Sequence, residues 1–186
     1  MVTRFSNIVD CSSSKKAIFL DRDGVIVQSY QENGKPIPAR KLSDFIILDG
    51  VAQALIRFKQ AGFYTLVVTN QPDLAKGLLD IKVLLAMNNI MLSTLALDNI
   101  YVCKCLEGPS CDCYKPKPGM LLEAAGDYSL SLEECFMIGD RWRDIDAGKN
   151  VGCQTVFIDR GYNEKAPTDP DFTAKSLLSA ADILLR

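Results

Sequence analysis

The chain has 186 residues, of which 48 % are hydrophobic and 24 % are charged, and its net charge is −2. This composition is typical of one globular domain, and the charge balance shows no excess of basic residues of the kind that nucleic-acid binding requires. No apolar run is long enough to cross a membrane, and residues 1–16 are polar and rich in serine. We therefore expect a leader over 1–16, one domain over 17–186, a cytoplasmic location and a monomer without nucleic-acid or membrane partners.

The chain contains seven cysteines and no histidine. Cytoplasmic thiols stay reduced, so the cysteines are expected to be metal ligands or buried thiols rather than disulfides. Without histidine, acid–base work falls to carboxylates, lysine, tyrosine, cysteine or water.

The first predicted strand, 17–21, is an apolar run that leads directly into Asp21 and Asp23. Ligands of parallel sheets bind beyond the carboxyl ends of the strands. Two neighbouring carboxylates repel each other unless a bound divalent cation compensates them. Arg22, between the two acids, is expected to point away and to contribute backbone contacts only. The alternative is a strand that simply ends in an acidic turn.

A long polar connection follows at 27–47 and contains Gly34, Pro36 and Pro38. Long loops in compact domains are commonly functional, so we expect this segment to form a flap over the site. An ordinary solvated surface loop is the alternative.

The next predicted elements are a helix over 50–61 and a buried strand over 63–68 that runs into Thr69, Asn70 and Gln71. A hydroxyl or amide at this place can donate to a phosphoryl oxygen. These residue types also close strands without any function, and that alternative stays open here.

The remaining chain continues to alternate between helices and strands. The predicted helices span 79–97, 118–128, 144–151 and 177–185, and the predicted strands span 99–102, 135–138 and 154–158. Such alternation predicts an α/β fold with a parallel sheet and helices on both of its faces.

Polar clusters follow four of the predicted strands. They comprise Asp21 and Asp23, then Thr69 and Asn70, then Lys115, and finally Asp140 and Asp144. The carboxyl ends of parallel strands form one rim, so these side chains are expected to meet there. Carboxylates, a hydroxyl and a lysine at one rim predict a site for a phosphate and a divalent cation.

Four cysteines lie within eleven residues in the pattern C-x-C-x₅-C-x-C, namely Cys103, Cys105, Cys111 and Cys113. Four thiolates suit a closed, tetrahedral structural Zn²⁺ site, which would fix the loop before Tyr114 and Lys115. Two disulfides or four free thiols are the alternatives. Cys11 is interpreted as a thiol of the leader, and Cys135 and Cys153 as core residues.

Four segments together resemble a known family. FLDRDGVI, VVTNQPDLAKG, CKC…CDCYKPKPGM and IGDRWRDIDAG are similar to the ordered motifs of the histidinol-phosphate phosphatase-like branch of the haloacid dehalogenase (HAD) superfamily, over about residues 17–162. Within that branch the nearest pattern is that of the D-glycero-D-manno-heptose-1,7-bisphosphate 7-phosphatases. The resemblance implies a HAD-like Rossmannoid three-layer α/β/α sandwich with a central parallel sheet, a zinc-binding loop and no large cap domain.

The resemblance also implies roles for the acidic residues. Asp21 would attack phosphorus to form an aspartyl phosphate, and Asp23 would act first as acid and then as base. Mg²⁺ would be held by Asp21, by the backbone carbonyl of Asp23 and by Asp140. Asp144 would orient Lys115 or a metal-bound water.

The other implied roles concern the phosphoryl group and the substrate. Thr69 and Lys115 would hold the phosphoryl oxygens, and the residues expected to contact the substrate are Asn70, Gln71, Tyr114 and Arg141. Two positions depart from the family pattern. Cys105 stands where one zinc ligand is usually histidine, and Tyr114 stands where the heptose phosphatases have arginine, so Tyr114 offers no positive charge to a second phosphate.

The sequence thus predicts a Mg²⁺-dependent phosphatase of a sugar phosphate monoester, namely heptose 1,7-bisphosphate or a related heptose phosphate. The alternatives are a histidinol-phosphate or other small-ester phosphatase and a polynucleotide 3′-phosphatase, the last disfavoured by the charge. A phosphosugar-binding protein without catalysis is a further alternative, which the complete set of acids and Lys115 disfavours.

Overall fold

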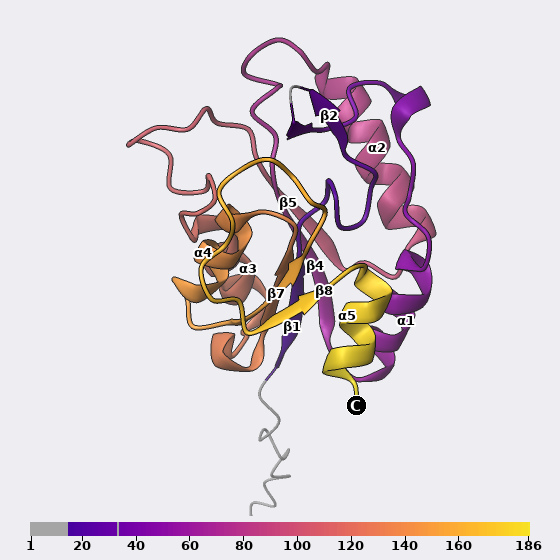
Figure 1. The fold of residues 1–186 in the computed structure, drawn as a ribbon, viewed down its shortest axis with the longest axis vertical. Coiled ribbons are helices and arrows are strands. Elements are labelled where there is room, and N and C mark those ends of the chain that lie inside the picture. Colours follow the sequence, from indigo (N-terminus) through magenta and orange to yellow (C-terminus); the bar gives the residue numbers. More distant parts are fainter. Residues whose placement is uncertain (1–14, 33) are drawn as a thin grey trace, which may run out of the picture.

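The computed structural model describes residues 15–32 and 34–186, so Cys11 and most of the predicted leader lie outside the described residues. A six-stranded sheet forms the centre, with the strand order β5-β4-β1-β6-β7-β8 (Figure 1). All neighbouring strands are parallel. The strands are β1 (Ala17–Leu20), β4 (Tyr64–Asn70), β5 (Asn99–Cys103), β6 (Phe136–Gly139), β7 (Gln154–Ile158) and β8 (Phe172–Ala174).

Helices cover both faces of the sheet. One face carries α1 (Val51–Gln60), α2 (Ile81–Thr94) and α5 (Leu177–Leu184), and the other carries α3 (Gly119–Tyr128) and α4 (Trp142–Lys149) (Figure 1). Side chains of β1 point alternately to the two faces of the sheet and so enter both hydrophobic cores. Ile18 packs in the core beside α1 and α5, whereas Phe19 packs in the core beside α3 and α4. The predicted three-layer α/β/α sandwich is therefore confirmed.

Most predicted elements are present, with small shifts at their ends. Helix α4 begins at Trp142, two residues before its predicted start, because the Asp144 carboxylate accepts from the Arg141 backbone N–H and caps the first turn. Strand β1 ends at Leu20, so Asp21 stands just beyond the sheet. Strand β8 was not predicted, since a three-residue edge strand within a polar segment has no clear periodicity.

The predicted flap at 27–47 contains secondary structure that its polar sequence did not indicate. Strands β2 (Tyr30–Glu32) and β3 (Lys35–Ile37) form an antiparallel hairpin, and the 3₁₀ helix η1 (Leu42–Asp44) follows; a second one, η2 (Leu132–Glu134), precedes β6. Ile37 and Arg40 line the same cavity as the acids after β1, so this segment forms one wall of the site.

In the part of the chain that the structure describes, no helix has both the length and the apolar character needed to cross a membrane.

Candidate active site

A cavity of about 210 Å³ opens at the carboxyl ends of the strands. Most of the residues that the sequence singled out line it together, namely Asp21, Asp23, Thr69, Asn70, Tyr114, Lys115, Asp140, Arg141 and Asp144. Gln71 is fully buried and does not line the cavity. The rim of a parallel sheet therefore gathers side chains that lie up to 123 positions apart, from Asp21 to Asp144.

Lys115 lies at the centre of this group and is 2 % exposed. Its Nζ donates to Asp21 Oδ1 at 2.7 Å, to the Val68 carbonyl at 2.7 Å, and contacts Asp144 Oδ1 at 2.6 Å. Burial alone would lower the pKa of Lys115, but the two carboxylates outweigh it and raise that pKa, so the ammonium stays charged. All three of its hydrogens have acceptors, which fixes the ammonium beside Asp21.

Asp144 has both carboxylate oxygens occupied. Oδ1 contacts Lys115, and Oδ2 accepts the Arg141 backbone N–H at 3.0 Å. Burial raises the pKa of Asp144 to about 6 in spite of the lysine. Gly139 is required here, because a Cβ atom at that position would lie 2.1 Å from the Asp144 Cβ. Asp144 thus holds Lys115 and the start of α4.

Asp140 differs because one of its oxygens is free. Oδ2 accepts from the Tyr162 hydroxyl at 2.8 Å, whereas the buried Oδ1 has no hydrogen-bond partner. Burial and the charges of Asp21 and Asp144 raise the pKa of Asp140 well above its ordinary value. A buried carboxylate oxygen without a partner, next to two further carboxylates, is unfavourable unless a cation binds there.

Asp23 is held by two neighbours. Gln71 Nε2 donates to Asp23 Oδ2 at 2.8 Å and to Thr69 Oγ1 at 3.0 Å, so both amide hydrogens are used within the protein. The Arg22 guanidinium donates to both Asp23 oxygens, at 3.0 and 3.1 Å. Burial raises the pKa of Asp23, and Arg22 offsets only part of that rise. A carboxyl with a raised pKa is suited to donate a proton.

The expectation that Arg22 makes backbone contacts only is wrong. Its side chain is fully buried and forms the ion pair with Asp23. The alternation argument fails because the strand ends at Leu20, so Arg22 already lies in a turn in which its carbonyl accepts from the Ile26 and Val27 N–H groups.

Asn70 clamps the backbone of the lysine. Its Oδ1 accepts the Lys115 N–H at 3.0 Å, and its Nδ2 donates to the Lys115 carbonyl at 3.2 Å. Both contacts join the end of β4 to the segment after the cysteine cluster. The amide therefore positions Lys115, although it also lines the cavity.

The carboxylates fit a divalent metal ion. Oxygens of Asp21, Asp140 and Asp144 lie within 4.8 Å of one another. Each Asp144 oxygen already has a partner, whereas Asp140 Oδ1 has none, so Asp140 together with Asp21 is the better placed to hold a cation. Gly24 leaves the required space: with φ +86°, a Cβ atom there would lie 1.8 Å from Asp140 Oδ2. An oxygen-rich set of this kind matches the preference of Mg²⁺.

Comparisons with known proteins agree with this geometry. Residues 112–180 match the HAD-hydrolase-like family. The chain is 31 % identical, over 90 % of its length and 94 % of the relative, to a D-glycero-D-manno-heptose-1,7-bisphosphate 7-phosphatase of Thermosynechococcus vestitus. It is 37 % identical to a D-glycero-beta-D-manno-heptose-1,7-bisphosphate 7-phosphatase of Photorhabdus laumondii, over 70 % of this chain and 73 % of that one. This chain belongs to the heptose-bisphosphate phosphatase branch of the HAD superfamily.

A solved HAD phosphatase shows the same fold. The D,D-heptose 1,7-bisphosphate phosphatase of B. bronchiseptica, a complex with magnesium and phosphate, has a TM-score of 0.74 and 30 % identity and covers 92 % of this chain and 98 % of its own. Family membership makes this chain a phosphoric monoester hydrolase of the HAD type.

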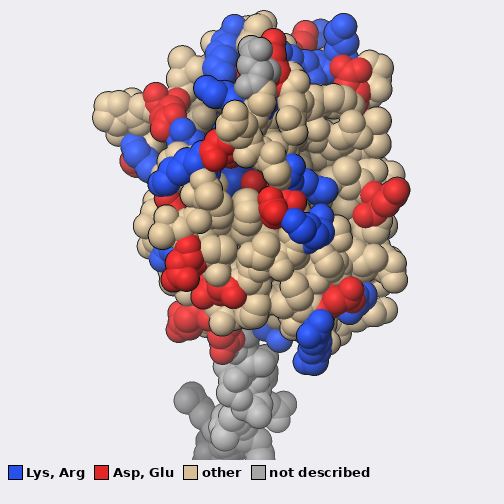
Figure 2. All heavy atoms as spheres, viewed as in Figure 1, with Lys and Arg blue, Asp and Glu red and all other residues tan. Residues whose placement is uncertain are grey.

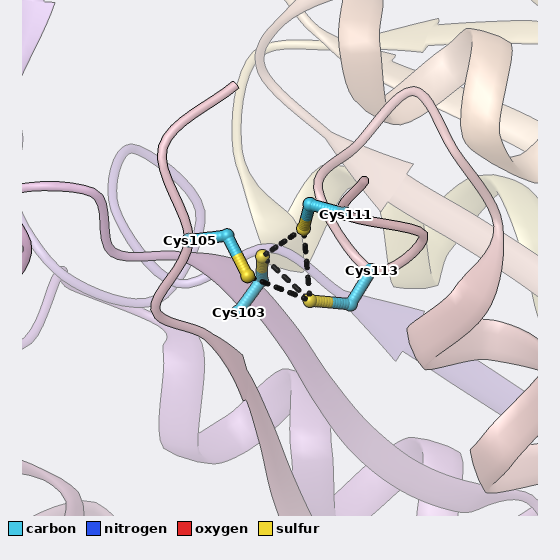
Figure 3. A group of neighbouring side chains, drawn as sticks. All are labelled: Cys103, Cys105, Cys111 and Cys113. Atoms are coloured by element: carbon cyan, nitrogen blue, oxygen red, sulfur yellow. Dashed lines mark hydrogen bonds between the residues drawn. The ribbon is translucent and has the colours of Figure 1, made fainter. Parts of the chain in front are cut away.

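In the present chain, the cysteine cluster forms a second group of side chains that could hold a metal ion. Figure 3 shows the sulfur atoms of Cys103, Cys105, Cys111 and Cys113 pointing toward one another. Their Sγ atoms all lie within 4.8 Å of one another. The Sγ–Sγ distances are 3.4 Å for Cys111–Cys113, 3.6 Å for Cys103–Cys111 and 3.9 Å for Cys105–Cys113. Tetrahedral zinc with Zn–S bonds of about 2.3 Å requires about 3.8 Å. The Cys103–Cys113 separation, 2.7 Å, is shorter than that but longer than a disulfide.

No disulfide joins the described cysteines. Cys135 and Cys153 are buried core residues, as the sequence predicted. The four clustered thiols are thus compatible with the zinc-binding loop expected of this branch.

Three basic side chains that the sequence analysis did not identify also line the cavity, namely Arg40, Lys76 and Arg143. Tyr162, whose hydroxyl joins Asp140 to Ser29, was likewise missed. A lone tyrosine in a loop gives no sequence signal, and Arg143 reads as an ordinary exposed residue of a short helix. On the face in Figure 2, Lys and Arg alternate with Asp and Glu rather than forming one basic patch.

Proposed function

We propose that this chain is a Mg²⁺-dependent phosphatase that removes the 7-phosphate of a heptose 1,7-bisphosphate through an aspartyl phosphate on Asp21. The observation that carries this proposal is the pairing of two acids with opposite environments. Asp21 faces the Lys115 ammonium, whereas burial raises the pKa of Asp23. One carboxylate is therefore suited to attack and the other to donate a proton.

In the first half-reaction an Asp21 oxygen forms a bond to phosphorus while the bond from phosphorus to the sugar oxygen breaks. Asp23 gives its proton to that leaving oxygen, so the sugar departs as an alcohol. The Thr69 hydroxyl lies in the same cavity and binds a phosphoryl oxygen. The Lys115 ammonium attracts the phosphoryl group by its charge and binds it by exchanging its hydrogen bond to Asp21 for one to a phosphoryl oxygen.

In the second half-reaction Asp23, now a carboxylate, takes a proton from water. That water attacks phosphorus, the bond from phosphorus to Asp21 breaks, and inorganic phosphate leaves. Arg22 and Gln71 hold Asp23 in one orientation for both steps. The same group thus acts as acid and then as base.

Asp21 and Asp140, with the backbone carbonyl of Asp23, would hold Mg²⁺. When bound, the ion screens the repulsion between the anionic nucleophile and the phosphate and offsets charge in the transition state. The buried, unpartnered Asp140 Oδ1 supports this assignment. Tyr114 and Arg141 contact the sugar side of the substrate. Asn70 and Gln71 act on the substrate indirectly: Asn70 positions Lys115, and Gln71 positions Asp23. The enzyme acts as a cytoplasmic monomer.

A panel of phosphate esters assayed with Mg²⁺ tests the substrate. Heptose 1,7-bisphosphate, heptose 7-phosphate, histidinol phosphate and a DNA 3′-phosphate are compared at equal concentration. We expect the highest kcat/KM for heptose 1,7-bisphosphate. A higher value for histidinol phosphate or for DNA would overturn the assignment and leave the phosphatase chemistry in place.

Zinc bound by the four cysteines is expected to stabilise the loop that carries Lys115. We predict one zinc per chain by elemental analysis of freshly purified protein, and a loss of stability on chelation, because structural zinc contributes folding free energy directly. Cys113→Ser should lower the zinc content and the melting temperature, while Cys153→Ser, outside the cluster, should keep the zinc. Protein without zinc that is indifferent to chelators would contradict the assignment.

A further inference from the structure

The proposed substrate has two phosphates, and the groups around Asp21 account for only the one that reacts. Besides Lys115, the basic side chains of the cavity are Arg40, Lys76, Arg141 and Arg143. Each of them is paired with a carboxylate. A second phosphate that pairs with one of these cations therefore competes with its carboxylate, and the partners differ in how firmly they are held.

Three of the four cations have partners that cannot easily leave. Arg40 and Lys76 share Asp73, whose side chain is only 5 % exposed, and the Arg141 partner Glu164 is 13 % exposed. Leaving such a buried carboxylate without its cation is strongly unfavourable.

Glu107, the partner of Arg143, is 60 % exposed. A carboxylate at that exposure regains its hydration when it leaves, and exposed ion pairs contribute little. Arg143 is thus the cation whose carboxylate partner a second phosphate can replace at the lowest cost.

The geometry of Arg143 also suits a phosphate. Its Nη1 and Nη2 donate to the two Glu107 oxygens at 2.7 and 3.0 Å, and this parallel fork is the arrangement that an arginine uses with two phosphate oxygens. The guanidinium lies 4.5 Å from the centre of the Trp142 ring and 5.7 Å from that of Tyr114. Aromatic faces at these distances attract the guanidinium and orient it.

Building on the proposed function, we propose that Arg143 binds the non-reacting phosphate of the substrate, in exchange for Glu107. In the heptose phosphatases an arginine stands at the position of Tyr114, beside the lysine. Here the guanidinium comes from Arg143 in α4, and the Tyr114 ring packs against it. Glu107 lies between the cysteines of the cluster, and its carboxylate acts as a built-in competitor for this subsite.

The test uses two substitutions with opposite expected effects. Arg143→Gln should raise the ratio of KM for heptose 1,7-bisphosphate to KM for heptose 7-phosphate by about 10- to 100-fold, the range for a charged bidentate contact. Glu107→Gln should lower the same ratio by about 2- to 5-fold, as expected for the removal of an exposed competing ion pair. Arg143→Lys, which keeps the charge and loses the fork, should fall between wild type and Arg143→Gln.

The control is Arg57→Gln, which breaks an exposed arginine–carboxylate pair with Asp182 outside the cavity and should leave the ratio unchanged. Binding of the bisphosphate and the monophosphate to Asp21→Asn protein, measured by calorimetry, gives the same ratio without turnover. It therefore tests Arg143 even if the wild-type enzyme prefers another ester. A ratio that does not respond to Arg143→Gln, or that moves in the same direction in both variants, would overturn the proposal.

Discussion

Asp21→Asn is expected to lower kcat by on the order of 10⁴- to 10⁶-fold, the range seen when a covalent nucleophile is removed. The amide oxygen is too weak a nucleophile to attack phosphorus. It still accepts a hydrogen bond, so the contact with Lys115 Nζ can persist. Rates measured with an ester and Mg²⁺, together with a thermal melt, separate lost chemistry from lost structure.

The fold should survive this substitution because it removes one negative charge from a buried group of three. Asp169→Asn, at an exposed position, is the matched control and should retain wild-type activity. Near-native turnover by Asp21→Asn would show that the attack comes from another group.

Lys115→Met is expected to destabilise the protein by about 3 to 5 kcal/mol, the cost of leaving a buried carboxylate without its cation. It should also lower kcat by about 10²- to 10³-fold, since one fixed donor to the phosphoryl group is lost. The effect is large because the Lys115 side chain is buried and faces Asp21 and Asp144 at once. Chemical denaturation and steady-state rates measure the two losses separately.

Two comparisons test the stated reason for this loss. Lys175→Met breaks an equally short pair with Asp159, but Lys175 is 78 % exposed, so the change should cost no more than about 1 kcal/mol. Adding Asp144→Leu to Lys115→Met removes a stranded carboxylate and should restore part of the stability without restoring activity. A double variant as unstable as the sum of its single variants would contradict the electrostatic account.

The sequence was sufficient for the sheet and for most of the rim. Short apolar runs that end in polar clusters identified β1, β4, β5 and β6, and parallel topology then required their ends to meet. That reasoning located Asp21, Lys115 and Asp140 without knowledge of any distance. It succeeds because burial on both faces leaves these strands an almost uniform apolar pattern.

The sequence was not sufficient for interactions set by tertiary structure. The ion pair between Arg22 and Asp23 depends on β1 ending at Leu20, because the alternation of side chains stops where the strand ends. Tyr162 reaches Asp140 from a loop whose path no periodicity encodes. Arg143 lies in α4, and only the packing of that helix brings its side chain to the cavity. The hairpin β2–β3 was missed because three-residue strands are too short to show alternation.

Trapping the phosphorylated enzyme tests the central claim most directly. In Asp23→Ala protein, p-nitrophenyl phosphate needs no acid for its first step, whereas the second step lacks its base, so the aspartyl phosphate should accumulate. We predict a burst of nitrophenolate equal to the enzyme concentration, and borohydride reduction followed by peptide mapping should find the modified residue at Asp21. A burst with the modification on any other residue, or turnover without a burst and without modification of Asp21, would contradict the account.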